Sequence, residues 1–146
     1  MGRVSDLLAR KSSVVHCVRP DDSVKHAIEN MIEFNVGALL VMEGTEIRGI
    51  FTERDVLRRV SLAGRAPDRT PVREVMTERL VYLDPTRSID ECMAVMTSAR
   101  VRHLPIVAER RLVGVISIGD VVRHLNAERE VELRYLSDYI AGRYPG

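Results

Sequence analysis

Residues 49–55 read GIFTERD and residues 114–120 read GVISIGD. Each stretch has a glycine, two apolar residues, a threonine or serine, two variable residues and an aspartate. The same offset aligns residues 20–60 with 85–125 without a gap and gives nine identities in 41 positions. Unrelated segments of ordinary composition would give about three. The chain is therefore read as two copies of one unit.

Each copy predicts the same order of elements: strand, helix, strand, strand, helix. The β-branched runs at residues 14–18 and 80–83 predict a first strand, and the apolar spacings of three and four that follow predict a helix. Two apolar runs joined by a polar turn predict a hairpin, and a second helix is expected to begin near Asp55 or Asp120.

This order places the chain in the mixed α/β, or α+β, class. A three-stranded sheet with both helices on one face leaves its other face bare, so the two copies are expected to pack face to face with pseudo-twofold symmetry. The predicted domains are residues 1–66, residues 67–126 and a C-terminal helical tail at 127–146.

Composition narrows the classes of partner. The chain has 146 residues, 45% of them hydrophobic and 29% charged, with a net charge of +1. That balance is typical of a globular protein and gives no general attraction to nucleic acid or to an acidic membrane. No apolar run approaches the ~18 residues of a membrane span, and no signal-peptide layout opens the chain, so a cytoplasmic location is expected.

The stretch after residue 125 lies outside the duplication. Leu133, Leu136 and Ile140 recur at helical spacing, which predicts a helix up to Ala141. Such a helix can pack on its own copy, or it can form a dimer or partner contact, because aromatic side chains favour interfaces. The aromatic residues of this stretch are Tyr135, Tyr139 and Tyr144.

The duplicated motif suits a nucleoside phosphate. An ionised aspartate only accepts hydrogen bonds, so Asp55 or Asp120 can take two from the 2′ and 3′ hydroxyls of a ribose. The hydroxyl of Thr52 or Ser117 can donate to phosphate, which a helix N-terminus also attracts, and the aliphatic strands offer walls for a flat base. The alternative is that each aspartate caps a helix. Both roles can hold at once.

The sequence resembles the paired form of the CBS domain family, named after cystathionine β-synthase. Besides the duplicated motif, the resemblance rests on VGALLV at 36–41, VRHLPIV at 101–107 and VREVMT at 72–77. It implies a regulatory module, usually a homodimer, with two clefts between the copies. Family members bind AMP, ADP, ATP, NAD or S-adenosylmethionine in such clefts and act on a partner protein.

The resemblance also implies the residues of each cleft. The ribose and phosphate positions of one cleft match Asp120 and Ser117, with Gly119, Arg102 and His103 beside them. The other wall of that cleft would consist of Lys11, Val14, His16, Val36, Gly37 and Ala38. The second cleft would hold Thr52, Arg54 and Asp55, with Thr77, Leu80 and Val81 opposite.

We therefore expect a ligand-sensing regulatory module for signal transduction that binds an adenine nucleotide. The alternative is a structural interaction module with vestigial clefts. An enzyme is not expected, because no set of acid, base and nucleophile is visible. The four histidines show no zinc-site spacing, so neither a metal nor a catalytic cofactor is expected. The natural adenosine ligand and the regulated partner stay open.

Overall fold

The computed structural model describes residues 2–11 and 14–127, which form two compact units. The first-repeat unit contains residues 14–82 with 109–111. The second-repeat unit contains residues 2–11, 83–108 and 112–127.

The first-repeat unit has a three-stranded sheet in the order β1-β2-β3. β1 pairs with β2 in parallel, and β2 pairs with β3 in an antiparallel hairpin that sets Ala38 opposite Thr52. Thr77 extends the edge, because its N–H and C=O both bond to Ile50 of β3. The elements are β1 (Cys17–Val18), α2 (Val24–Glu33), β2 (Ala38–Glu43), β3 (Glu46–Thr52), α3 (Glu53–Asp55), the π-helix η1 (Val56–Ser61) and the 3-10 helix η2 (Val72–Glu74).

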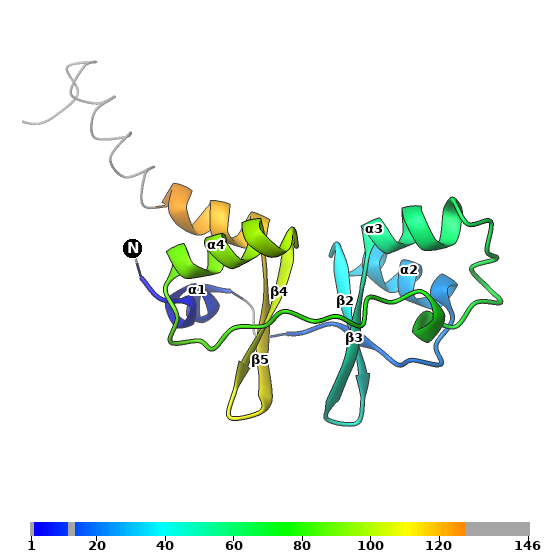
Figure 1. Ribbon diagram of the computed structural model, residues 1–146, viewed down its shortest axis with the longest axis horizontal. Helices are drawn as coiled ribbons and strands as arrows, with labels where there is room; N and C mark the ends of the chain where they lie inside the picture. The colour runs from blue at the N-terminus through cyan, green and yellow to red at the C-terminus, as the bar shows by residue number, and fades with distance from the viewer. Residues whose placement is uncertain (1, 12–13, 128–146) are drawn as a thin grey trace, which may run out of the picture. The chain divides into compact units, whose positions relative to one another are not determined.

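Helices α2 and α3 lie on the same side of this sheet (Figure 1). Leu39 and Val41 of β2 and Phe51 of β3 point to that side, because alternate strand residues face alternate sides. All three are fully or almost fully buried, and α2 covers them with apolar residues spaced for one helix face. The helical residues of this core are Val24, Ala27, Met31, Val60 and Val72.

The second-repeat unit repeats the hairpin and its helices. β4 pairs with β5, and Leu83 lies parallel to Ile106 of β4, as β1 lies beside β2 in the other unit. The elements are α1 (Val4–Arg10), α4 (Ile89–Ala99), β4 (His103–Ala108), β5 (Arg111–Ser117) and a helix over residues 118–127.

The N-terminal segment belongs to the second-repeat unit. The N–H of Val4 donates to the C=O of Arg87 at 2.8 Å, and the N–H of Ile89 donates to the C=O of Gly2 at 3.1 Å. Val4 and Leu7 of α1 are buried. Burial of apolar surface stabilises the folded chain by about 25 cal/mol per Å². The compact units therefore differ from the predicted domains, in which residues 1–66 stood together.

The predicted order of elements and the mixed α+β class are confirmed. The first strands are shorter than predicted, because only Cys17 and Val18 pair with β2, and within residues 80–83 only Leu83 forms a bridge. The tail predicted at 127–146 lies almost wholly outside the described residues, and the face-to-face packing of the copies stays a prediction. Over residues 2–11 and 14–127, no helix is long and apolar enough to cross a bilayer.

Candidate functional site

The motif GIFTERD spans the end of β3 and the first turn of α3. Thr52 is the N-cap residue, and its Oγ1 accepts from the N–H of Asp55 at 3.2 Å. The carboxylate of Asp55 accepts in return from the N–H of Thr52, at 3.0 Å to Oδ2. This reciprocal pair is a capping box, which satisfies two N–H groups that a helix start leaves free. The helix-capping role foreseen for the motif aspartate is therefore present.

Two further side chains reach Asp55. The hydroxyl of Thr77 donates to Oδ1 at 3.0 Å, and Nε of Arg59 lies 3.7 Å from the same oxygen. Arg59 also donates to the C=O of Met76 at 2.7 Å, which fixes the chain just before Thr77. Asp55 is 5% exposed, so these bonds replace the water that its carboxylate loses on burial.

The motif GVISIGD builds the same capping box at the start of helix 118–127. The N–H of Ser117 donates to Oδ2 of Asp120 at 2.8 Å, and Oγ of Ser117 accepts from the N–H of Asp120 at 3.1 Å. Here the further partners are cations. The ammonium of Lys11 lies 2.6 Å from Oδ2 of Asp120, and the guanidinium of Arg123 binds Oδ1.

These partners set the charge state of Asp120. Burial raises the pKa of its carboxyl, but the hydrogen bond from Lys11, the N–H and hydroxyl of Ser117 and the charge of Lys11 outweigh burial. The pKa of Asp120 consequently lies below its ordinary value, and the group is an anion at neutral pH. An ionised carboxylate accepts hydrogen bonds and donates none, as a ribose diol requires.

The motif glycines have packing reasons. A Cβ at Gly49 would lie 2.7 Å from the carbonyl oxygen of Thr77, a backbone atom that is itself bonded to Ile50. A Cβ at Gly114 would lie 2.9 Å from Cδ2 of Leu8, at the end of a side chain of α1. In each unit, the glycine lets another segment approach the strand that carries the motif.

The structure brings some of the predicted residues together. Lys11 contacts Asp120, and Thr77 contacts Asp55. The resemblance placed Lys11 and Thr77 on the walls opposite the motif residues, and their role toward a ligand stays a prediction. A Cβ on Gly119 would lie 3.6 Å from Oγ of Ser117, so this glycine stands beside the second capping box.

Gly37 and Ala38 lie beside Thr52 within the first-repeat unit. The C=O of Gly37 accepts from the N–H of Glu53 at 3.1 Å, and Ala38 is the strand partner of Thr52. The resemblance implies that Gly37 and Ala38 share a cleft with Asp120 of the other copy, and this stays a prediction. Val36 is half-buried and packs on the same core.

The remaining predicted residues lie outside the helices, in loops or at the start of a strand. The ring of His16 stacks on Phe34 with centroids 4.1 Å apart, and Val14 is exposed. Leu80 and Val81 are half-buried residues outside helices and strands, and His103 begins β4.

The two predicted arginines have no polar side-chain partner among residues 2–11 and 14–127. Arg54 and Arg102 are exposed, and neither forms a side-chain hydrogen bond or ion pair with the residues described. Their predicted role toward a ligand therefore has no support from partners within the units. It stays a prediction.

Sequence reasoning missed Arg59 and did not foresee what Arg123 binds. The available signal was spacing, since Arg123 is three residues and Arg59 four residues after its aspartate, where side chains share a helix face. Within the π-helix η1, Arg59 is the residue that forms the ion pair with Asp55.

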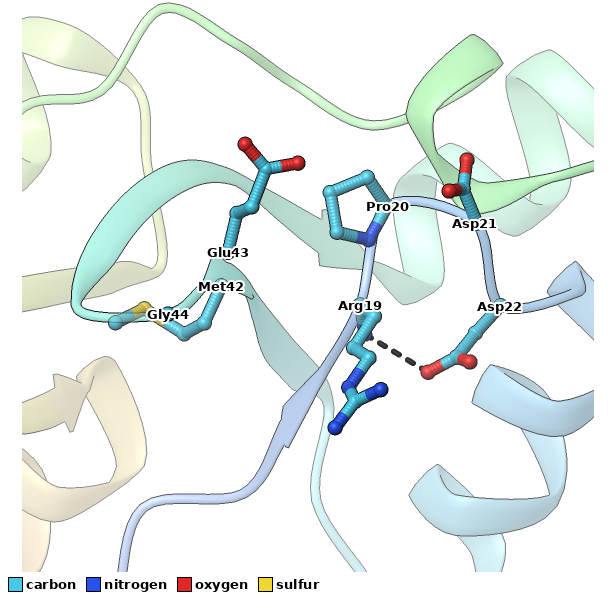
Figure 2. Close-up of a pocket in the computed structure, with 7 residues that line it drawn as sticks. All are labelled: Arg19, Pro20, Asp21, Asp22, Met42, Glu43 and Gly44. Atoms are coloured by element: carbon cyan, nitrogen blue, oxygen red, sulfur yellow. Dashed lines mark hydrogen bonds between the residues drawn. The ribbon is translucent and has the colours of Figure 1, made fainter.

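A separate pocket lies on the first-repeat unit (Figure 2). It opens between the turn after β1 and the end of β2, and the carboxylate of Asp22 accepts from the N–H of Arg19 at 2.8 Å. No residue predicted to bind ligand lines it. Its lining residues are Arg19, Pro20, Asp21, Asp22, Met42, Glu43 and Gly44.

Comparison with known proteins agrees with the duplicated motif. The sequence pattern of the CBS domain matches residues 4–62 and 72–127. A structure from Burkholderia ambifaria, of a protein with CBS domains assigned to signal transduction, superimposes with a TM-score of 0.84. It is 43% identical and covers 86% of this chain and 95% of that one.

Two further proteins are similar. The mitochondrial CBS domain-containing protein CBSX3 of Arabidopsis thaliana is 40% identical over 129 residues, or 85% of this chain, which spans 63% of that relative's length. Hypoxic Response Protein I, solved with two coordinated zinc ions, is 30% identical with a TM-score of 0.70, over 85% of this chain and 99% of that one. Among the residues described here, no three His, Cys, Asp or Glu side chains gather as a metal site would need.

Proteins built on paired CBS domains are commonly regulatory or signal-transduction modules, and they are generally not catalytic. Both repeats of this chain match the family's sequence pattern. In each repeat, the hairpin is followed by a helix whose first turn carries the motif aspartate in a capping box. The chain belongs to the CBS domain family.

Proposed function

We propose that this protein is a regulatory module that binds an adenosine nucleotide, such as AMP, ATP or NAD, and transmits its binding to a partner protein. The observation that carries the proposal is the pair of buried, ionisable acceptors, Asp55 and Asp120, each held at the end of a motif strand. In the clefts that the family resemblance implies, each would accept from the hydroxyls of one ribose.

The geometry supports this chemistry because each carboxylate is fixed before a ligand arrives. Asp120 is locked by its capping box, so binding would not have to immobilise its side chain. Hydrogen bonds to a charged group contribute on the order of 1.5 to 3 kcal/mol. Ser117 would add a hydroxyl beside the same carboxylate.

A second candidate is a structural interaction module whose motif no longer binds a ligand. The engagement of both aspartates favours it: Oδ2 of Asp120 already accepts from Ser117 and Lys11, and Asp55 accepts from Thr52 and Thr77. In that case the carboxylates serve the fold alone, and partner binding would use other surfaces.

Mass spectrometry of nucleotide released from the purified, denatured protein separates the two candidates and names the ligand. Thermal shift is the second measurement, since a ligand at 100 times its dissociation constant adds about 2.7 kcal/mol of stability. Calorimetry with AMP on Asp120→Ala should then show affinity reduced about tenfold or more. The matched control is Asp90→Ala, which alters an exposed carboxylate of α4.

Two results would contradict the nucleotide proposal. One is the absence of both released nucleotide and any thermal shift with AMP, ADP, ATP or NAD. The other is equal affinity in the wild type and Asp120→Ala at every site. A homodimer and a cytoplasmic location also remain proposals, and the Arabidopsis relative is named as mitochondrial.

A further inference from the structure

Lys11 makes two short contacts, one with β5 and one with the first turn of helix 118–127. Its ammonium donates to the C=O of Val115 at 2.5 Å and to Oδ2 of Asp120 at 2.6 Å. The Lys11 side chain keeps 32% of its surface exposed, whereas the Asp120 side chain keeps 9%. The lysine therefore stands on the accessible side of a carboxylate that is otherwise enclosed.

The acceptor positions of Asp120 are almost filled without a ligand. Oδ2 takes the N–H of Ser117 and the ammonium of Lys11, which uses both of its lone pairs. Oδ1 takes the guanidinium of Arg123, whose side chain is 74% exposed and whose attraction is correspondingly screened by water. The Ser117 bond belongs to the helix cap, so the Lys11 bond is the one that an incoming hydroxyl can replace on Oδ2.

The two motifs differ at this position. The Oδ2 atom that takes the capping N–H also meets the neutral hydroxyl of Thr77 at 3.3 Å in Asp55, and the positive ammonium of Lys11 at 2.6 Å in Asp120. A ribose hydroxyl can replace another hydroxyl at equal charge. It cannot replace an ammonium in the same way, because the half-buried cation is then left without its anion.

We propose that Lys11 makes the Asp120 site selective for phosphorylated adenosine over the free nucleoside. When the ribose takes Oδ2 of Asp120, the ammonium of Lys11 is displaced and binds the ligand's phosphate. When a nucleotide binds, its ribose displaces Lys11 from Asp120, and its phosphate then serves as the new anionic partner of Lys11. Adenosine displaces Lys11 in the same way but carries no phosphate to replace the carboxylate. Lys11 is thus a specificity-determining residue. This inference rests on the proposed function and adds to it the discrimination between nucleotide and nucleoside.

The chain offers a direct probe, because Lys11 and Lys25 are its two lysines. Lys25 is an exposed residue of α2 with no side-chain partner in the described units, so it serves as an internal reference. Acetylation of the native protein by an N-hydroxysuccinimide ester, followed by peptide mass spectrometry, gives both labelling rates. Adenosine should raise the rate at Lys11 severalfold relative to Lys25, whereas AMP should leave it slow.

Calorimetry on variants supplies the second readout. In Lys11→Met, the ratio of AMP affinity to adenosine affinity at the Asp120 site should fall about tenfold. Adenosine no longer has to displace a cation, and AMP loses the cation that binds its phosphate. Lys11→Arg should restore most of the ratio, and Lys25→Met should leave it unchanged. The binding event that disappears from the calorimetric titration of Asp120→Ala identifies the Asp120 site.

The outcomes separate this inference from the proposed function. If AMP binds but neither ligand alters Lys11 labelling and Lys11→Met keeps the wild-type ratio, the exchange is wrong while nucleotide binding stands. If neither AMP nor adenosine binds the wild type, the proposed function fails, and the inference fails with it. The labelling arm uses wild-type protein, so it decides the matter even where Lys11→Met does not fold.

Discussion

The hydroxyl of Thr77 donates to Oδ1 of Asp55 at 3.0 Å, across 22 positions of the chain. Thr77 also forms two backbone bonds with Ile50, so the segment after η2 is tied to β3 and to the motif aspartate together. Thr77, which lies near the start of the second sequence repeat, therefore helps to hold the motif of the first repeat.

Thr77→Val should destabilise the protein. Valine keeps the shape of threonine but leaves an oxygen of the buried Asp55 with one donor fewer, which costs about 1 to 3 kcal/mol. Urea unfolding followed by circular dichroism measures the loss. Thr77→Ser keeps the hydroxyl and should recover most of the stability, and equal stability of the valine variant and the wild type would count against the bond.

Gly49→Ala and Gly114→Ala should differ although the two glycines hold the same place in the motif. The added methyl group at position 49 meets the carbonyl of Thr77, which two backbone bonds hold in place, and overpacking of this kind costs about 1 to 3 kcal/mol. At position 114 it meets the end of the Leu8 side chain, which can turn away. Thermal unfolding should show the larger loss for Gly49→Ala, and the reverse order would contradict the packing described here.

Acid should weaken the protein partly through Asp120. The pKa of this carboxyl is lower in the folded chain than its ordinary value of 3.8, so at acid pH the unfolded chain binds the proton more readily. The stabilisation is complete above about pH 5 and is lost as pH falls through the folded pKa. The unfolding free energy of Asp120→Asn should therefore depend less on pH between about 5 and 3 than that of the wild type. Asp90→Asn is the control, and an unchanged pH dependence in Asp120→Asn would refute this contribution.

A homodimer is expected in solution, as the family resemblance implies. Light scattering should give about twice the 16.5 kDa of one chain at tens of micromolar protein. If the tyrosine-rich stretch after residue 126 contributes to the interface, truncation after Asn126 should loosen the dimer. A mass of one chain would contradict the prediction, and an equally tight truncated dimer would remove the tail from the interface.

The sequence determined the duplication, the order of the elements and the motif aspartates. Periodicity is a local property, so α2, α4 and the two hairpins could be read from residues close to one another in the chain. Capping is equally local, which is why Asp55 and Asp120 could be foreseen as caps and as acceptors.

Tertiary structure decided what surrounds those acceptors. Lys11 reaches Asp120 across 109 positions, and α1 packs in the unit of the second repeat, although in sequence it opens the first repeat. Each carboxylate has an arginine nearby, but its partner from a distant segment is a hydroxyl at Asp55 and an ammonium at Asp120, a difference that the matched motifs do not contain. Such contacts depend on where the chain returns after many residues. The repeated sequence fixes the backbone pattern of each copy, whereas Lys11 and Thr77 reach the carboxylates from segments far away in the chain.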